Sequence, residues 1–387
     1  MQDSTLRTFR GLTILSLVLA LANHLLPPTQ YSATQLLVTY DGGFVRRGMG
    51  GELLSLVLPD RVRIPEIYLA AFMITLAGAA SFYVALFARM RGSLTTMLLM
   101  LIALNSFAFS SFVGSTGYLD GLLMVLAATA LASPSEANWG LAMRVALLLF
   151  GALIHEVMVP YFMMLIALDI WLAEEGRRRW RAALPVVAGC SAVILLFTLG
   201  DVTPEISAKI VENVRARAAF APHEGGLQTI AFSMTDHLAF AEQHRAHASH
   251  NTMLLFDGVP LGAMVLWIWW LGTRLLGDGQ AGARLIFLLV LLAPLSLNMV
   301  AVDVARFFCA AALSGFLALG LILVRVPGAR ARLAETLTLG HALAVLVLSS
   351  NLFTYEFNSG TGYMAQAPWI WFEQGAWFAA GDSGRGQ

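Results

Sequence analysis

Long runs of apolar residues alternate with short polar segments along most of the chain. A helix needs about 20 consecutive apolar residues to cross the hydrocarbon core of a bilayer. On that rule the pattern predicts about eleven membrane-spanning helices, and the division of the stretches 141–173 and 284–324 depends on a polar interruption within each. The predicted spans are residues 11–27, 66–88, 93–113, 118–133, 141–155, 157–173, 183–200, 257–275, 284–299, 306–324 and 334–352.

The composition is that of a membrane protein. Of 387 residues, 58% are hydrophobic and 12% are charged, and the mean hydropathy is +0.72. Soluble domains carry about 25% charged residues. The formal net charge is +0, so no general attraction draws the chain to nucleic acid. We therefore predict an all-α, polytopic integral membrane protein that forms a single transmembrane domain over residues 1–387.

Arginine is distributed unevenly over the predicted loops. Cytoplasmic loops of membrane proteins carry an excess of Lys and Arg. If the N-terminus is inside, the inner loops hold most of the arginine, including the basic runs at 174–181 and 325–332. The pattern predicts a multi-pass protein of the bacterial inner membrane, with a cytoplasmic N-terminus and a periplasmic C-terminus.

The first outer loop, residues 28–65, is predicted to contain two short helices in the membrane interface, at about 31–39 and 49–58. A glycine-rich turn joins them. The turn carries an acid at the height where a lipid-linked phosphate would be presented.

Two further segments are expected on the outer side. The loop 201–256 is long enough for two or three short helices, and residues 204–219 have an amphipathic pattern that favours a cover over the outer face. The tail 353–387 is rich in Trp and Phe, which indicates an aromatic segment at the membrane interface.

The glycine-rich turn is the segment best suited to chemistry. It reads YDGGFVRRGMGGE over residues 40–52. Glycine lets the backbone approach a ligand closely, and a guanidinium can bind two oxygens of a phosphate at once. The alternative is that the arginines are solvated or pair with Glu52 and Asp60. The turn offers a candidate base, two candidate phosphate ligands and three supporting residues: Asp41; Arg46 and Arg47; and Tyr40, Gly42 and Gly43.

Three other outer turns bring ionisable residues to helix ends. A charge at membrane depth costs about 2.5–3.5 kcal/mol on insertion scales, so it needs a partner or a function. His155 and Glu156 lie between two predicted helices, where His155 could shuttle a proton; the alternative is a capping turn. Asp120 begins the fourth predicted span, where an acid also favours the helix dipole.

Asp303 and Arg306 are three residues apart at a predicted helix start and would share one face. Arg306 could bind a phosphate with Asp303 as its orienting partner. The alternative is an internal ion pair that stabilises the turn.

A metal site is not predicted with certainty from any motif. Residue 159 is Val, so the HExxH pattern of zinc proteases is absent after His155. His244, His247 and His250 recur every three residues and could offer two ligands, or lie on a solvated helix. A divalent cation, Mg²⁺ or Mn²⁺, held by His155 and Glu156 is the remaining possibility.

The arrangement of a short inner N-terminus, a first span and an outer loop with two juxtamembrane helices and an acid resembles the GT-C superfamily of polytopic glycosyltransferases. It is also similar in kind to glycan polymerases of the Wzy and EpsG types. The resemblance implies sugar transfer at the extracytoplasmic face, from a polyprenyl-(di)phosphate donor to a glycan or glycolipid acceptor, in surface polysaccharide or glycolipid assembly. It implies that Asp41 is catalytic. With the residues described above, we expect His155 and Glu156 to complete the catalytic site, Arg46, Arg47 and Arg306 to bind the donor, and Asp120 and Asp303 to support them.

Three other functions stay open. A repeat-unit polymerase would use the same chemistry. A lipid-linked sugar flippase or a small-solute transporter would line both sides of the membrane with polar residues, whereas this sequence concentrates them at one face. A structural subunit of a polysaccharide assembly complex would tolerate substitution of the outer polar residues. Membrane lipids are expected partners in every case.

Overall fold

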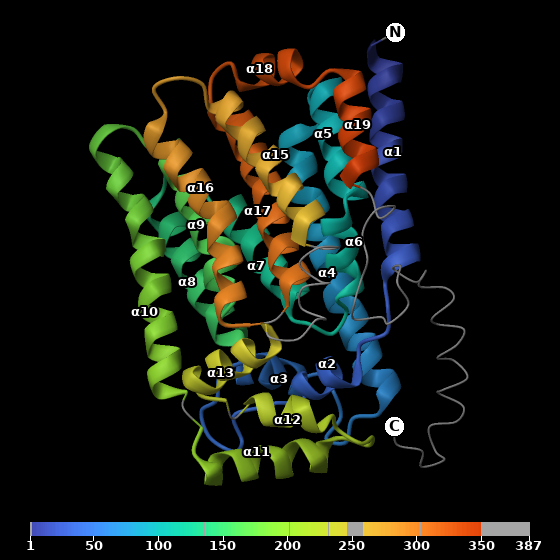
Figure 1. Ribbon diagram of the computed structural model, residues 1–387, viewed down its shortest axis with the longest axis vertical. Helices are drawn as coiled ribbons and strands as arrows, with labels where there is room; N and C mark the ends of the chain where they lie inside the picture. Colours follow the sequence, from blue (N-terminus) through green and yellow to red (C-terminus); the bar gives the residue numbers. More distant parts are fainter. Residues whose placement is uncertain are drawn as a thin grey trace.

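The computed structural model describes residues 2–134, 136–200, 202–230, 232–245, 258–301 and 303–349. Long helices run side by side to form a bundle, and short helices form a layer across one end, which we call the cap (Figure 1). The bundle helices are α1 (Gln2–His24), α4 (Ile64–Met90), α5 (Leu94–Asn105), α6 (Phe107–Gly114), α7 (Asp120–Ala132), α8 (Asn138–Ile154), α9 (Met158–Ala173), α10 (Ala183–Leu199), α15 (Val259–Leu276), α16 (Ala281–Leu295), α17 (Val304–Arg325) and α19 (Leu339–Ser349). The cap helices are α2 (Gln30–Gln35), α3 (Gly48–Ser55), α11 (Pro204–Arg217), α12 (Glu224–Ile230) and α13 (Met234–Arg245). The short η1 (Gly176–Ala182) and α18 (Ala329–Thr336) lie at the end away from the cap, and η3 (Ser296–Met299) follows α16.

The helices agree in position with the predicted spans, but the count of eleven is not confirmed. Among the described residues, six helices are long and apolar enough to cross a membrane, or eight if each bent pair, α5 with α6 and α18 with α19, is one span. The other three, α7, α8 and α9, are apolar but have only 13, 17 and 16 residues. They are short because polar turns interrupt the apolar runs at both ends of α7 and between α8 and α9.

Helix α17 is the centre of the bundle. It contacts α4, α6, α9, α15 and α16, and 89% of its most apolar window is buried. A Cβ atom at Gly315 would lie 2.7 Å from the Leu291 side chain and 2.8 Å from that of Ile268. The missing side chain therefore lets α15 and α16 pack closely on α17, as small residues do in membrane bundles.

A cluster of buried charges ties five helices together in the half of the bundle away from the cap. Arg144 of α8 places Nη2 2.6 Å from Oδ2 of Asp169 on α9, and the two side chains are 0% and 1% exposed. Arg325 of α17 places Nε 3.5 Å from the other oxygen of Asp169. Arg144 and Arg89 of α4 also donate to the carbonyls of Ser133 and Leu131 at the end of α7, where cations are favoured. The cluster therefore fixes how these helices pack.

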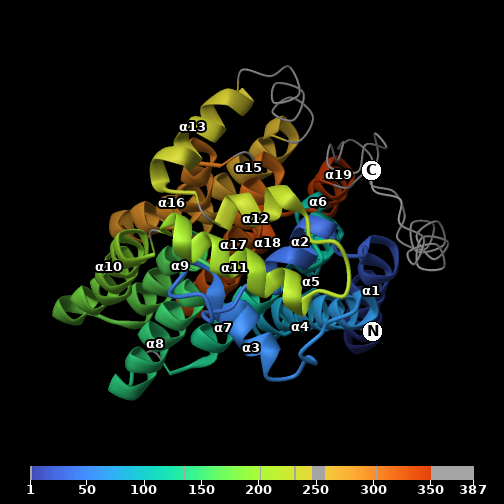
Figure 2. The ribbon, with the colours of Figure 1, turned by 90° about the horizontal axis from the view of Figure 1, so that it is seen from below.

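The cap is joined to the first loop by hydrogen bonds. Arg217 Nη1 donates to the carbonyl of Leu37 at 3.1 Å, and the backbones of Val62 and Ala219 are hydrogen-bonded at 2.8 Å. Figure 2 shows α11 and α12 lying over α2 and α3. The structure thus confirms the short helices that we predicted in both loops. The tail at 353–387 lies outside the described residues.

Helix α11 confirms the amphipathic pattern. Ile210 and Val214 are buried against the first loop, whereas Lys209 is exposed. A Cβ atom at Gly42 would lie 2.9 Å from the Ile210 side chain. The glycine is therefore needed for α11 to cover the turn.

Removing one partner of a buried ion pair leaves an unpaired charge, which costs about 3–5 kcal/mol. We expect Arg144→Ala to lower the free energy of unfolding by about 3 kcal/mol or more, measured by thermal or denaturant unfolding in detergent micelles. The matched control is Arg178→Ala, which removes an exposed arginine of η1. Equal stability of the two variants would contradict the role of the buried cluster.

Candidate functional site

The glycines of the first loop fold the chain back on itself and direct Arg47 into the bundle. A Cβ atom at Gly48 would lie 2.5 Å from the Tyr40 ring, and one at Gly51 would lie 2.0 Å from the Val38 carbonyl oxygen. Arg47, the N-cap of α3, has φ 71°, and it is the single non-glycine residue with positive φ among those described. Such a conformation costs on the order of 1 kcal/mol or more and collects at functional sites.

Arg47 forms a forked ion pair with Glu156. Its Nε lies 3.0 and 3.1 Å from the two carboxylate oxygens, and Nη2 lies 2.5 Å from Oε1. The Glu156 side chain is only 12% exposed. We predicted Glu52 or Asp60 as alternative partners of the arginines, but the structure pairs Arg47 with an acid from the turn between α8 and α9.

Glu156 in turn contacts His155, the C-cap of α8. His155 Nδ1 lies 3.2 Å from Glu156 Oε2 and accepts a hydrogen bond from the backbone N–H of Val157 at 3.3 Å. Burial raises the pKa of Glu156, but the positive charge of Arg47 outweighs burial and holds that pKa well below its usual value. Burial, with Arg47 nearby, lowers the pKa of His155. Near neutral pH the site therefore holds a glutamate anion beside a neutral histidine.

The protonation states decide which ring nitrogen is available. The carboxylate anion beside Nδ1 favours the tautomer in which Nδ1–H turns to Glu156, in place of the Val157 N–H contact that Nδ1 accepts in this structure. Nε2 is then left as a proton acceptor. This orientation of an imidazole by an acid is the arrangement that hydrolases use to prepare a general base.

A second forked ion pair joins Asp120, the first residue of α7, to Arg306 in the first turn of α17. Arg306 Nε and Nη2 lie 2.6 and 2.7 Å from the two oxygens of Asp120. The guanidinium carbon lies 4.4 Å from the centre of the Tyr118 ring, a cation–π contact. Asp303 lies 3.6 Å from Arg306 Nη1. The principal partner of Arg306 is therefore Asp120, and Asp303 is a weaker neighbour than its spacing suggested.

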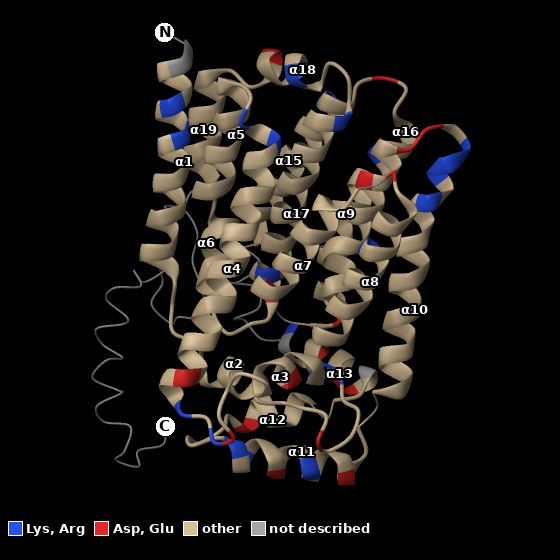
Figure 3. Ribbon diagram, turned by 180° about the vertical axis from the view of Figure 1, so that it is seen from behind, with Lys and Arg blue, Asp and Glu red and all other residues tan. Residues whose placement is uncertain are grey.

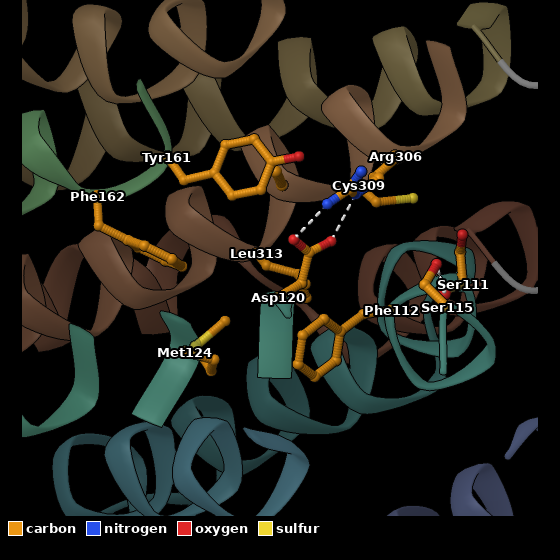
Figure 4. Close-up of a pocket in the computed structure, with 11 residues that line it drawn as sticks. Ser111, Phe112, Ser115, Asp120, Met124, Tyr161, Phe162, Arg306, Cys309 and Leu313 are labelled. Carbon is orange, nitrogen blue, oxygen red and sulfur yellow. Dashed lines mark hydrogen bonds and ion pairs between the residues drawn. The ribbon is translucent and has the colours of Figure 1, made fainter. Parts of the chain in front are cut away.

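A small hollow, with room for about one water molecule, opens beside this pair, between α6, α7, α9 and α17. Figure 4 shows Asp120 and Arg306 at its edge and the Tyr161 ring directed toward Arg306. Its walls are largely apolar, with Phe112 and Phe162 among them. The hollow therefore leaves a small, mostly apolar space next to the charged residues.

The two ion pairs belong to one site. The positive charge of Arg47 acts on the Asp120 carboxylate, and the charges of Arg47 and Arg306 both act on His155. His237 of α13 adds a group from the cap: burial, followed by the charges of Arg47 and Arg46, lowers its pKa to about 4. The site therefore lies where the cap meets the bundle. The first loop and α13 contribute residues from the cap side, and three turns of the bundle contribute the others.

Arg46 holds the cap in place over this site. It is buried, its Nη2 donates to the carbonyl of Phe232, and its guanidinium carbon lies 4.6 Å from the centre of the Phe197 ring. These contacts connect the first loop to α10 and to the segment before α13. Arg46 therefore has a structural role beside the site.

The remaining predicted residues lie on the cap turn. Asp41 is exposed and accepts a hydrogen bond from Thr39 Oγ1 at 2.8 Å; its described contacts do not reach the two ion pairs. Tyr40 stacks on Phe44, with ring centres 5.5 Å apart, and Gly43 has φ 129°. The catalytic role of Asp41 stays a prediction.

The sequence reasoning missed Tyr161 and His237 as residues of the site. Tyr161 lies among apolar residues near the start of α9, six positions after His155, and such a tyrosine is hard to distinguish from a packed core aromatic. His237 lies in a loop that carries several histidines. Spacing alone did not separate it from the others.

Comparison with known proteins places the chain in a family. A sequence model described as "Uncharacterised membrane protein Rv1490" matches residues 10–265. The chain belongs to this family. The matched segment of this chain includes Arg47, Asp120, His155 and Glu156, whereas Arg306 lies beyond it. Neither the curated proteins nor the solved structures give a match.

No group of three or more His, Cys, Asp and Glu residues is arranged to hold a metal ion within the described ranges. His247, His250 and the side chain of His244 lie outside those ranges. A divalent cation held by His155 and Glu156 therefore stays a prediction.

The lowered histidine pKa values give the site a pH dependence. Between the pKa of about 4 for folded His237 and about 6.5 for the unfolded chain, the unfolded state binds more protons. The free energy of unfolding should therefore fall as the pH drops from about 6.5 to 4. Because the pKa of His155 is lowered as well, His155→Gln and His237→Gln should each flatten the fall, measured by thermal unfolding across this range. An undiminished slope in both variants would contradict the assignment.

Proposed function

We propose that this protein is a membrane glycosyltransferase that takes a sugar from a polyprenyl-(di)phosphate-linked donor on the cap side of the membrane. The observation that carries the proposal is the convergence of two forked Arg–carboxylate pairs and a neutral histidine beside an apolar-walled hollow. The arginines suit a phosphate leaving group, and the histidine suits an acceptor hydroxyl.

The distribution of arginine supports a cap that faces the periplasm. The start of α1, η1 and α18 lie at the opposite end of the bundle, and Figure 3 shows basic residues on them. Under the positive-inside rule this end faces the cytoplasm. The donor would then be presented at the outer leaflet of the bacterial inner membrane.

The proposed reaction uses His155 as the general base. Its Nε2 takes the proton of an acceptor hydroxyl while the hydroxyl oxygen attacks the anomeric carbon of the donor. The bond from that carbon to the phosphate oxygen breaks, and the phosphate leaves with the bonding electrons. Glu156 orients the imidazole and balances its charge once it is protonated.

The positive charge of the arginines is the second contribution to the rate of the proposed reaction. Negative charge grows on the departing phosphate, and preorganised cations that meet it are usually the largest catalytic term. Arg47 and Arg306 are both held in fixed orientations by carboxylates, so little reorganisation is needed. The geometry favours His155 over Asp41 as the base, because Asp41 lies on the exposed cap turn.

Removal of a general base usually costs about 10²–10⁴-fold in rate. We expect His155→Gln to lose transfer by at least about a hundredfold and Arg306→Lys to be impaired because it loses the fork. The measurement is sugar transfer from a polyprenyl-phosphate donor by the purified full-length protein, together with surface-glycan analysis of a complemented deletion strain.

Lys209→Gln is the matched control, because Lys209 is exposed on α11. Asp41→Asn tests the residue favoured by the GT-C resemblance. If Asp41→Asn loses sugar transfer while His155→Gln keeps it, the general base lies on the cap turn. Restored glycan length separates a single-sugar transferase from a repeat-unit polymerase. Full activity of every variant would rule out the proposed site and favour a transporter or a scaffold.

A further inference from the structure

We infer that Arg47 controls whether His155 can act as a base. While the guanidinium of Arg47 neutralises Glu156, the proton of the His155 ring stays on Nε2. When a phosphate oxyanion binds Arg47, Glu156 is released and holds the ring proton on Nδ1 instead, which leaves Nε2 free to accept a proton. This inference rests on the proposed function and deepens it, because it makes the arrival of the phosphate the event that prepares the general base.

The surroundings of His155 Nδ1 are the first observation. Nδ1 accepts a hydrogen bond from the backbone N–H of Val157 at 3.3 Å, so in this structure it carries no proton. A neutral imidazole has one proton, which then lies on Nε2. In that tautomer Nε2 is a donor and cannot take a proton from a hydroxyl. The structure therefore holds His155 in the tautomer that cannot act as the base.

The contacts of Glu156 Oε2 are the second observation. This oxygen lies 3.2 Å from His155 Nδ1 and 3.1 Å from Arg47 Nε. Arg47 and His155 therefore compete for the same oxygen, and the permanently charged group is the stronger donor. If Arg47 were engaged elsewhere, Glu156 would be left as a buried charge without its partner. A hydrogen bond from Nδ1–H would then stabilise the carboxylate.

Access to Arg47 is the third observation. Its side chain is 27% exposed, compared with 12% for Glu156 and 7% for His155. Arg47 Nη1 has no hydrogen-bond partner among the described residues, whereas Nε and Nη2 are held by Glu156. A ligand that enters from solvent therefore meets Arg47 first. Because a guanidinium binds phosphate as readily as carboxylate, an oxyanion at Nη1 can share its charge and loosen its hold on Glu156.

The change of tautomer leaves the charge of the ring unaltered. One proton leaves Nε2 for water and another reaches Nδ1, so the imidazole stays neutral. The other ionisable groups that act on His155 or Glu156 are Arg306, Asp120 and His237. Arg306 and Asp120 form an ion pair of their own. Arg47 is thus the cation that competes directly for Glu156.

The test is NMR of isotope-labelled imidazole nitrogens in the purified full-length protein, in a maltoside detergent and a phosphate-free buffer. The chemical shifts report which ring nitrogen carries the proton, and His155→Gln identifies the signals of His155. Added inorganic phosphate should shift the ratio of the two tautomers toward Nδ1–H by roughly tenfold or more, as expected for a hydrogen bond gained to a charged group. Signals that stay unmoved as phosphate is added would overturn the inference.

A variant tests the same change without a ligand. Arg47→Met removes the guanidinium, so His155 should carry its proton on Nδ1 even in phosphate-free buffer. Arg215→Met is the matched control, because Arg215 also forms an ion pair on the cap, at 2.8 Å from Glu224, but both side chains are exposed. The control should keep the wild-type signals. Wild-type signals in a folded Arg47→Met protein would contradict the role of Arg47.

Phosphate oxygens also occur in lipid headgroups, and a second arm of the test separates the two sources. The wild type is placed in nanodiscs of phosphatidylglycerol, with no inorganic phosphate present. The signals of His155 should stay those of the phosphate-free protein. If these nanodiscs alone change the tautomer, the headgroup is the trigger and the donor phosphate is not.

The outcomes also separate this inference from the proposed function. If inorganic phosphate changes the tautomer of His155 but no sugar is transferred, the control by Arg47 stands and the glycosyltransferase is wrong. If sugar is transferred but neither phosphate nor Arg47→Met changes the tautomer, the glycosyltransferase stands and the control by Arg47 is wrong.

Discussion

Pairing of buried charges between helices is the constraint on which this structure depends. An isolated charge in an apolar bundle is so costly that it must find a partner of opposite sign. Three of the ion pairs that meet this requirement join distant elements: Arg144 with Asp169, Arg47 with Glu156, and Arg306 with Asp120. Each pair joins elements that are separate in sequence. The pairs therefore specify the packing of helices whose apolar faces alone would fit many neighbours.

The pairs at the two ends of the bundle differ in their surroundings. The Arg144–Asp169 pair is closed in by helices and capped by the end of α7, which suits a purely structural role. The two pairs under the cap adjoin a histidine, an unsatisfied tyrosine hydroxyl and a hollow. A pair that can exchange its carboxylate contact for a ligand contact is useful for binding. The surroundings, more than the pairs themselves, distinguish the functional end.

Hydrophobic pattern predicted the helices well because lipid imposes a continuous apolar run on every spanning segment. It also indicated the breaks at His155 and before Arg306, since polar residues interrupt the runs there. The pattern predicted poorly which charged residues form ion pairs with one another. Spacing relates Arg306 to Asp303, three residues away, but carries no information about Asp120, which is 186 positions distant. Tyr161 resembles any core aromatic until its unpaired hydroxyl is seen in three dimensions.

The distance along the chain between contacting residues also bears on how the protein is made. Leu37 in the first loop accepts its hydrogen bond from Arg217, 180 residues later. Asp120 pairs with Arg306, which is synthesised 186 residues after it. Membrane insertion begins during synthesis, so the first loop and α7 emerge long before their partners exist. Until α17 is inserted, these polar groups must stay in water or at the membrane surface. Assembly of the site is therefore a late step, and a ribosome-bound chain carries an open, unpaired version of the same residues.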